Sequence, residues 1–186
     1  MNPIDLGDHT LKQKLNKPFL WFRDSLPVGI SIGRLSKEKG FDTLLKAVKE
    51  VNKSFKYRHI ICGIGKEKEN LVNQAIKLNL QDKVYFADYV KEKNIWLRNS
   101  DVFVSTSRWE GCPNVILEAL ACNIPVISTN CPYGPSELLQ SGKWGILVDV
   151  DSEVQISRAI IEAIDYPKKQ NQDLEIYLRK NFLQNL

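Results

Sequence analysis

Short runs of β-forming residues alternate along this chain with longer stretches in which apolar residues recur every three or four positions. The short runs predict six strands, at Val28–Ile32, Arg58–Cys62, Val84–Phe86, Asp101–Ser105, Pro125–Ser128 and Gly145–Val148. The longer stretches predict helices at Gly40–Lys53, Lys66–Leu78, Lys91–Asn99, Pro113–Cys122, Gly134–Gln140 and Ser152–Ile164, and a last helix within Asn171–Leu183. Strand and helix therefore follow one another from residue 28 onward.

This alternation predicts an α/β fold, a doubly wound and mainly parallel six-stranded sheet with helices on both faces. Parallel strands joined by helices form right-handed crossovers, and in such Rossmann-like folds ligands bind beyond the carboxyl ends of the strands. A chain of 186 residues, 43% of them hydrophobic, has the size and apolar content of one such domain, which we assign to residues 28–186. The residues that follow each predicted strand are the candidates for a functional site.

Two carboxylates flank the start of the predicted helix Pro113–Cys122. Glu110 lies in the loop before it, and Glu118 is the only charged residue within it. Because an unpaired buried carboxylate is costly, Glu118 requires a hydrogen-bond partner or a polar cleft. At about 1.5 Å of rise per residue the two acids lie about 10 Å apart. That separation is too large for a shared catalytic bond but suits the two ends of a nucleotide-linked substrate, with its phosphates at the helix N-terminus.

The segment from Glu110 to Glu118 resembles the Glu-x7-Glu motif of the family 4 retaining glycosyltransferases, which have the GT-B architecture. In that family the motif is followed by Ala-x-Ala-x-x-x-Pro-Val, here Ala119, Ala121, Pro125 and Val126. The resemblance implies that Glu110 is a catalytic residue that contacts the donor sugar near its reacting carbon. It also implies that Glu118 accepts hydrogen bonds from the ribose hydroxyls of the donor.

The same resemblance implies further donor contacts where the helix begins, because backbone N–H groups at a positive helix end can meet sugar or phosphate oxygens. The segment expected to bind the donor consists of Gly111, Cys112, Pro113, Asn114 and Val115. Pro113 fits the first turn of a helix, where its missing N–H costs nothing. A nucleophilic role for Cys112 is rejected because no base accompanies it.

A basic loop, Gly33-Arg34-Leu35-Ser36-Lys37-Glu38-Lys39-Gly40, follows the first predicted strand. It is similar to the Gly-Arg-Leu-x-x-x-Lys-Gly motif of the same family, whose Arg and Lys bind the diphosphate. The resemblance therefore implies that Gly33, Arg34 and Lys39 bind the donor. Arg34 and Lys39 are also expected to be catalytic, since they stabilise negative charge as the nucleotide departs. The alternative is a basic loop that only caps a helix.

The second predicted strand ends in a Gly-x-Gly turn at Gly63 and Gly65. As a dinucleotide fingerprint it is weak, because Lys68 stands where the third glycine belongs and the turn follows the second strand. The family has a similar turn here, which implies donor contacts by both glycines, and a tight structural turn is an equal alternative. After the third strand, Ala87 and Asp88 replace the glycine-containing turn of the family and leave the base unspecified.

The beginning of the chain, Asn2-Pro3-Ile4-Asp5, resembles the segment that joins the two domains in this family. We therefore assign residues 1–27 to an interdomain-linker-like segment and lead-in. The resemblance covers Asn2 to about Val150 and implies that the N-terminal acceptor domain is missing from this chain. Because that domain often carries the catalytic His of the family, neither His9 nor His59 is assigned the role.

Charge and composition exclude several other classes of protein. The net charge of +4 is mild and scattered, which argues against a nucleic-acid partner. No apolar run approaches the roughly 20 residues of a membrane span, and the first residues do not form a signal peptide. A cytoplasmic protein is expected, at most peripheral to the inner face of the membrane. The four cysteines form no Cys-x-x-Cys pair, which favours reduced and mostly buried thiols.

Asp149-Val150-Asp151 superficially matches an Asp-x-Asp metal motif of another glycosyltransferase class. Its place between a strand and a helix favours a helix N-cap at Asp151 or Ser152 instead. The family that the chain resembles needs no metal at this point, so neither a metal nor another cofactor is expected.

These features predict the donor-binding domain of a retaining enzyme that transfers a hexosyl group from a nucleotide-diphosphate sugar to a glycan or lipid-linked acceptor hydroxyl. The run from Cys131 to Glu137 has the Cys-Pro-x-Gly-Pro-x-Glu form found in bacterial surface-glycan enzymes of this kind, which implies polysaccharide, lipopolysaccharide or glycolipid synthesis. One alternative is a non-catalytic nucleotide-sugar-binding module or inert split-gene remnant. Another is an unrelated doubly wound oxidoreductase or phosphate-binding regulator.

Overall fold

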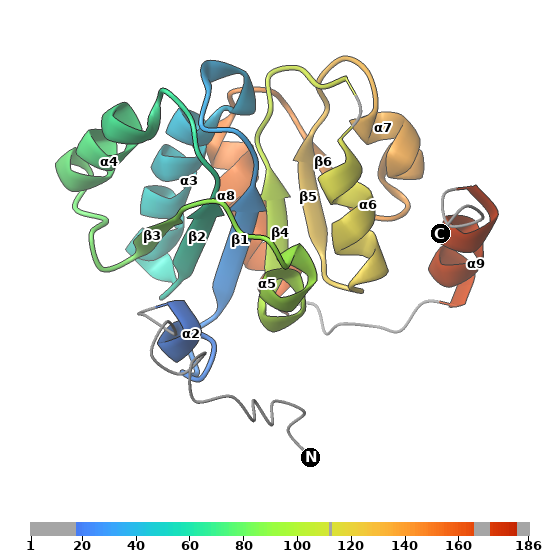
Figure 1. Cartoon of the computed structure of the whole chain (residues 1–186), viewed down its shortest axis with the longest axis horizontal. Helices are drawn as coiled ribbons and strands as arrows, with labels where there is room; N and C mark the ends of the chain where they lie inside the picture. The colour runs from blue at the N-terminus through green and yellow to red at the C-terminus, as the bar shows by residue number, and fades with distance from the viewer. Residues whose placement is uncertain (1–17, 112, 166–171, 182–186) are drawn as a thin grey trace.

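The computed structural model describes residues 18–111, 113–165 and 172–181. Its six strands form one sheet in the order β3-β2-β1-β4-β5-β6, and all five neighbouring pairs are parallel (Figure 1). The strands are β1 Val28–Ile32, β2 Arg58–Cys62, β3 Val84–Ala87, β4 Val102–Ser105, β5 Val126–Thr129 and β6 Ile146–Val148. This order confirms the predicted doubly wound sheet, with each strand within one residue of its expected bounds.

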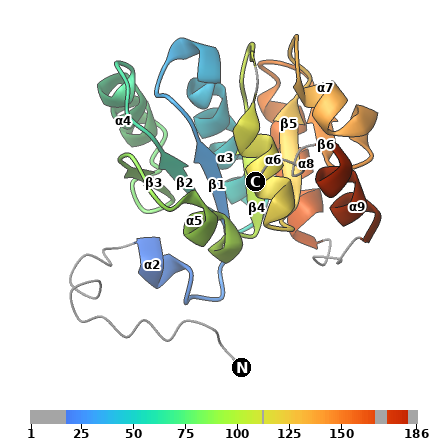
Figure 2. The ribbon, with the colours of Figure 1, turned by 45° about the vertical axis from the view of Figure 1, so that its right-hand side comes forward.

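Helices cover both faces of the sheet (Figures 1 and 2). One face carries α3 Phe41–Ser54, α4 Lys68–Lys77 and α8 Glu153–Asp165, and α3 and α8 pack closely against each other. The other face carries α5 Lys93–Asn99, α6 Asn114–Ala121, α7 Pro135–Leu138 and α9 Gln172–Asn181. A short helix, α2 Pro18–Trp21, precedes β1.

One predicted helix is shorter than expected. The stretch Gly134–Gln140 forms only the four-residue helix α7, which is followed by a separate 3₁₀ turn at Gln140–Gly142. Gln140 and Ser141 have φ angles of 44° and 55°, which lie in the left-handed region and end a right-handed helix. The apolar spacing alone could not predict this change of backbone conformation.

Alternate residues of the strands enter two separate hydrophobic cores. On β4, Val102 and Val104 pack under α3 and α8, whereas Phe103 packs under α5 and α6. The strands are apolar on both faces because helices exclude water from each, as is typical of parallel sheets. Burial of each such side chain contributes about 1.5–3 kcal/mol to folding.

A chain of hydrogen-bonded polar side chains crosses the centre of the sheet. His59 is fully buried, with Nδ1 2.7 Å from the hydroxyl of Tyr57 and Nε2 2.9 Å from the hydroxyl of Ser31. The Ser31 hydroxyl donates to the carbonyl of Val104, so it accepts from Nε2–H, and Nδ1 accepts from Tyr57. Gly29 makes room for this chain, because a Cβ there would lie 1.7 Å from the Tyr57 oxygen.

The N-terminal assignments stay predictions. Residues 1–17, which include Asn2-Pro3-Ile4-Asp5 and His9, lie outside the described residues. Within the described ranges no helix combines the length and the apolar character that a transmembrane span requires.

The buried histidine makes stability depend on pH. Burial lowers the pKa of His59 from 6.5 to about 3, so the folded protein keeps this imidazole neutral while the unfolded chain takes up a proton below about pH 6.5. The contribution is complete above that pH and is lost as the pH falls toward 3. Between pH 6 and 4 we expect His59 to add about 1.4 kcal/mol per pH unit to the slope of the unfolding free energy.

Urea unfolding of the wild type and of His59→Gln at pH 7.5, 6, 5 and 4 measures this contribution. The variant should be less stable at pH 7.5 and should show the shallower slope, while carboxylates contribute equally to both proteins. Parallel slopes would contradict the assignment.

Candidate functional site

The loops after β1 and β2 pack backbone against backbone at the carboxyl edge of the sheet. Leu35 N–H donates to the carbonyl of Ile64 at 2.9 Å. A Cβ on Gly63 would lie 1.8 Å from the carbonyl oxygen of Gly33, and one on Gly65 would lie 2.2 Å from that of Leu35. Packing within the protein therefore requires both glycines, in agreement with the structural alternative for this turn.

A cavity of about 300 Å³ lies beside these loops. Its lining joins residues from the ends of β1 and β2 with the segment after β3, and consists of Ile32, Gly33, Arg34, Cys62, Gly63, Ile64, Tyr89, Val90 and Lys93. Three predicted site residues, Gly33, Arg34 and Gly63, thus meet in one place. Gly65 does not line the cavity. Burial raises the pKa of the Cys62 thiol to about 12, so this wall is neutral and the charge comes from Arg34 and Lys93.

The segment after β3 differs from the expected family pattern in a simple way. Ala87 extends β3 by one residue, and Asp88 forms an exposed ion pair with Lys68 of α4. Of the three aromatic residues here, Tyr85 and Phe86 pack against the two cores, whereas Tyr89 is exposed at the cavity. Two of the three are therefore core residues.

Lys39 and Glu110 form an ion pair between the loops after β1 and β4. Lys39 Nζ lies 2.5 Å from Glu110 Oε1, and the same oxygen accepts a hydrogen bond from the Ser107 hydroxyl at 2.5 Å. The Glu110 side chain is only 8% exposed, so the lysine compensates a nearly buried charge. The backbone of Gly40, with φ at 61°, approaches the carbonyl of Thr106 so closely that any Cβ would collide with it.

Arg108 holds this arrangement together. Its guanidinium binds both carboxylate oxygens of Asp42 at 2.8 and 2.9 Å, the carbonyl of Lys37 at 2.6 Å and the carboxylate of Asp151. These groups belong to the turn before α3, to α3 itself and to the loop after β6. The two carboxylates raise the pKa of Arg108 above its usual value. Sequence reasoning missed this residue, although its place directly after a strand end was a usable signal.

The structure decides between the two expected N-caps, Asp151 and Ser152, in favour of Ser152. Asp151 has φ at 58° and accepts hydrogen bonds from Arg108 and from the Thr43 hydroxyl, and Arg108 lowers its pKa. Ser152 instead caps α8, because its hydroxyl oxygen lies 3.4 Å from the N–H of Gln155. Among the residues that the structure describes, no three His, Cys, Asp or Glu side chains gather as metal ligands would.

The predicted donor-binding segment forms the turn into α6. Pro113 is the residue before the helix rather than its first residue, and α6 begins at Asn114. Gly134 packs against the Pro113 ring, where a Cβ would lie 2.7 Å from Cδ, whereas Gly111 has open space around it. Val115 is half-buried against the core under α6. Cys112 lies outside the described residues.

Glu118 has the partner that its position in an apolar helix requires. Lys93 Nζ, from the first residue of α5, lies 2.5 Å from Glu118 Oε1. The other oxygen, Oε2, is buried and has no hydrogen-bond partner among the described residues. Lys93 also lines the 300 Å³ cavity, so it links Glu118 to Arg34 and Gly63. Sequence reasoning missed Lys93 because it treated the loop after β3 only as a departure from the family pattern.

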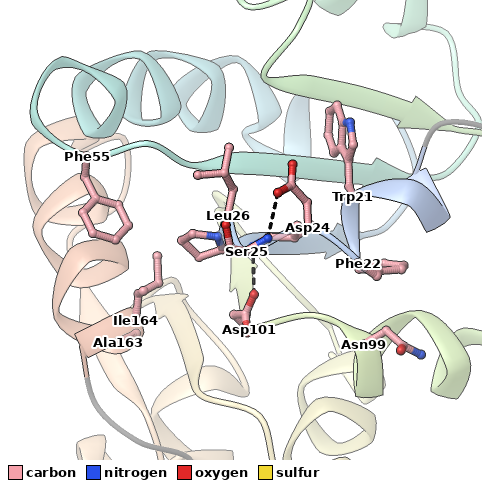
Figure 3. Close-up of a pocket in the computed structure, with 12 residues that line it drawn as sticks. Trp21, Phe22, Asp24, Ser25, Leu26, Phe55, Asn99, Asp101, Ala163 and Ile164 are labelled. Carbon is pink, nitrogen blue, oxygen red and sulfur yellow. Dashed lines mark hydrogen bonds between the residues drawn. The ribbon is translucent and has the colours of Figure 1, made fainter. Parts of the chain in front are cut away.

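A cavity of about 620 Å³ lies at the opposite, amino edge of the sheet (Figure 3). It is lined by the segment from Trp21 to Val28 together with Phe55, Asn99, Asp101, Ala163 and Ile164. Asp101 accepts a hydrogen bond from the N–H of Val28 there. None of the predicted site residues contributes to it, so size alone does not identify the site.

Replacing Arg108 should release three segments at once. Arg108→Met is expected to lower the free energy of unfolding by about 1.5–3 kcal/mol, because it leaves two carboxylates without their charge-assisted donor. Arg179→Met is the matched control, since Arg179 forms an exposed pair with Glu175 one turn away. It should cost no more than about 0.5 kcal/mol. Equal losses in the two variants, measured by urea unfolding at pH 7.5, would contradict the role of Arg108.

Comparisons with known proteins extend these observations. The profile of the family Glycosyl transferases group 1 matches residues 13–180. An uncharacterized glycosyltransferase of Methanocaldococcus jannaschii is 44% identical in an alignment of 140 residues, which covers 68% of this chain and 34% of the relative. The lipopolysaccharide core biosynthesis glycosyltransferase LpsE of Rhizobium meliloti is 35% identical over 138 residues, 74% of this chain and 39% of the relative. The chain thus spans little more than a third of these relatives.

Solved structures share the fold. The C-terminal domain of the glycosyl transferase group 1 family protein LpcC from Francisella tularensis aligns with a TM-score of 0.73 and 24% identity, covering 90% of this chain and 93% of that one. HepE of Anabaena in complex with UDP-glucose also aligns with a TM-score of 0.73 and 24% identity, over 89% of this chain and 44% of that one. With its parallel sheet and a family match along most of its length, the chain belongs to the group 1 glycosyl transferases.

Proposed function

We propose that this chain is the donor-binding domain, equivalent to the C-terminal half, of a retaining family 4 glycosyltransferase. The enzyme would transfer a hexosyl group from a nucleotide-diphosphate sugar to an acceptor hydroxyl. The observation that carries the proposal is made at the carboxyl edge of the sheet. There the loop after β1 supplies Lys39, which pairs with Glu110, and Arg34, which lines the cavity. The acceptor would be bound by an N-terminal domain of the same enzyme.

The charged residues of the predicted site and the turn into α6 each have a part in this proposal. Arg34 offers a planar fork of donors and Lys39 a compact charge, and together they would bind the diphosphate and stabilise it as a leaving group. Glu110 would contact the sugar, and Glu118 the ribose. The turn from Gly111 into α6 would bring backbone N–H groups to the sugar and phosphates.

The comparisons support the division into halves and the class of donor. LpcC supplies a separately solved C-terminal domain of nearly the same extent, and HepE has the same fold and was solved with UDP-glucose. The name of LpsE supports a place in the synthesis of a surface glycan such as lipopolysaccharide. A lipid-linked or growing glycan acceptor would place the enzyme in the cytoplasm, at most peripheral to the membrane.

Calorimetric titration with UDP, GDP and ADP tests the donor site. One diphosphate should bind, and Arg34→Ala and Glu118→Ala should each weaken it roughly 10- to 100-fold, because each removes a hydrogen bond to a charged group. Lys37→Ala is the matched control in the same loop, since the Lys37 side chain is exposed and only its carbonyl binds Arg108.

Binding of a diphosphate and the absence of binding each decide whether the donor-site proposal holds. Binding that depends on Arg34 and Glu118 but not on the Lys37 side chain would establish a preformed donor site. If a folded wild-type chain binds none of the three diphosphates, the donor-site proposal is wrong and an inert remnant is favoured.

Removal of divalent metal should not alter donor binding. The cations Arg34 and Lys39 would compensate the charge of the diphosphate. Asp151, which belongs to the Asp-x-Asp sequence, already accepts hydrogen bonds from Arg108 and Thr43. We expect the dissociation constant in 1 mM EDTA to lie within about threefold of that in 5 mM MgCl₂. A tenfold loss of affinity in EDTA would show that a metal ion takes part in binding.

A further inference from the structure

The strongest unassigned feature is the ammonium group of Lys93, which lines the cavity and binds the half-buried carboxylate of Glu118. Lys93 begins α5, and its side chain reaches across to α6, where Nζ lies 2.5 Å from Glu118 Oε1. The same side chain lines the cavity beside Gly33, Arg34 and Gly63. Neither the family motifs nor the predicted site includes Lys93.

The two oxygens of Glu118 are in different situations. Oε1 is held by Lys93, whereas Oε2 is buried without a hydrogen-bond partner among the described residues. A buried carboxylate oxygen without a donor is unfavourable, and a ligand hydroxyl would satisfy it. Lys93 thus accounts for half of the hydrogen bonding of this carboxylate and leaves the other half open.

The hydrogen bond from Lys93 also fixes the orientation of Glu118. Each of the two oxygens of a carboxylate can accept hydrogen bonds. Because Lys93 Nζ is bound to Oε1, the plane of the carboxylate is fixed and Oε2 keeps a defined direction. A fixed pair of acceptors matches the vicinal 2′- and 3′-hydroxyls of a ribose.

We propose that Lys93 is a positioning residue that orients Glu118 as a two-oxygen acceptor and so selects ribonucleotide over 2′-deoxyribonucleotide donors. This inference rests on the proposed donor site. Lys93 acts through Glu118 and does not itself contact the nucleotide. Its loss should therefore affect the recognition of the 2′-hydroxyl more than the binding of the diphosphate.

The experiment compares UDP, GDP and ADP with dUDP, dGDP and dADP by calorimetric titration of the full chain. For the diphosphate that binds, the wild type should prefer the ribose form roughly 10- to 100-fold, the effect of one hydrogen bond to a charged group. Lys93→Met should bring this preference to about threefold or less while weakening the deoxy form no more than about threefold. Lys93→Gln is a second neutral variant, Lys93→Arg should retain the preference, and Lys91→Met is the control.

Each outcome separates this inference from the proposed function. If the wild type discriminates and Lys93→Met discriminates equally well, Lys93 does not position Glu118. If Lys93→Met weakens ribose and deoxyribose forms equally, Lys93 contacts the nucleotide directly and the positioning role is wrong. If the wild type binds a diphosphate without preferring ribose, the inference fails while the donor site stands. If it binds none, both fail.

Discussion

The guanidinium of Arg108 is the interaction on which the carboxyl edge of the sheet depends. It joins the turn at Lys37, the first turn of α3 at Asp42 and the loop after β6 at Asp151. The first two are close together in the sequence, whereas Arg108 lies 66 positions after Asp42 and 43 positions before Asp151. Because the guanidinium is planar and rigid, its hydrogen bonds fix the relative positions of these segments and also compensate the charges of the two carboxylates.

The sheet and its loops contribute differently to the candidate site. Two hydrophobic cores support the strand ends, and the loops that leave them carry Lys39 and Glu110, whereas Lys93 and Glu118 belong to α5 and α6. Gly40, Gly63 and Gly65 let the loop backbones approach one another more closely than any side chain would allow. On this edge Lys39 pairs with Glu110, and Lys93 pairs with Glu118. Both acids therefore lie beside a cation of the protein.

The two ion pairs place opposite demands on a donor. A diphosphate has to approach Lys39 although Glu110 already neutralises it, so Arg34 supplies the positive charge that is not compensated by a direct ion pair among the described residues. The proposed ribose contact, in contrast, would leave the Lys93 ion pair in place, because Oε2 of Glu118 has no hydrogen-bond partner among the described residues. These are the demands that the proposed nucleotide-diphosphate sugar would have to meet.

The sequence by itself determined the strands, the parallel sheet and the helices from residue 28 onward apart from α7, and it predicted a site at the carboxyl edge of the sheet. These follow from local periodicity and from the right-handed crossover, which act within a few tens of residues. It also identified Glu118 as a charge that needs a partner, because an unpaired carboxylate in an apolar helix is costly. Only the tertiary structure decided that the partner is Lys93. It also decided that Arg108 joins three segments of the chain, and that Asp151 binds Arg108 while Ser152 caps α8. Such pairings join residues 25 to 71 positions apart, and no local pattern encodes which of many exposed charges will meet.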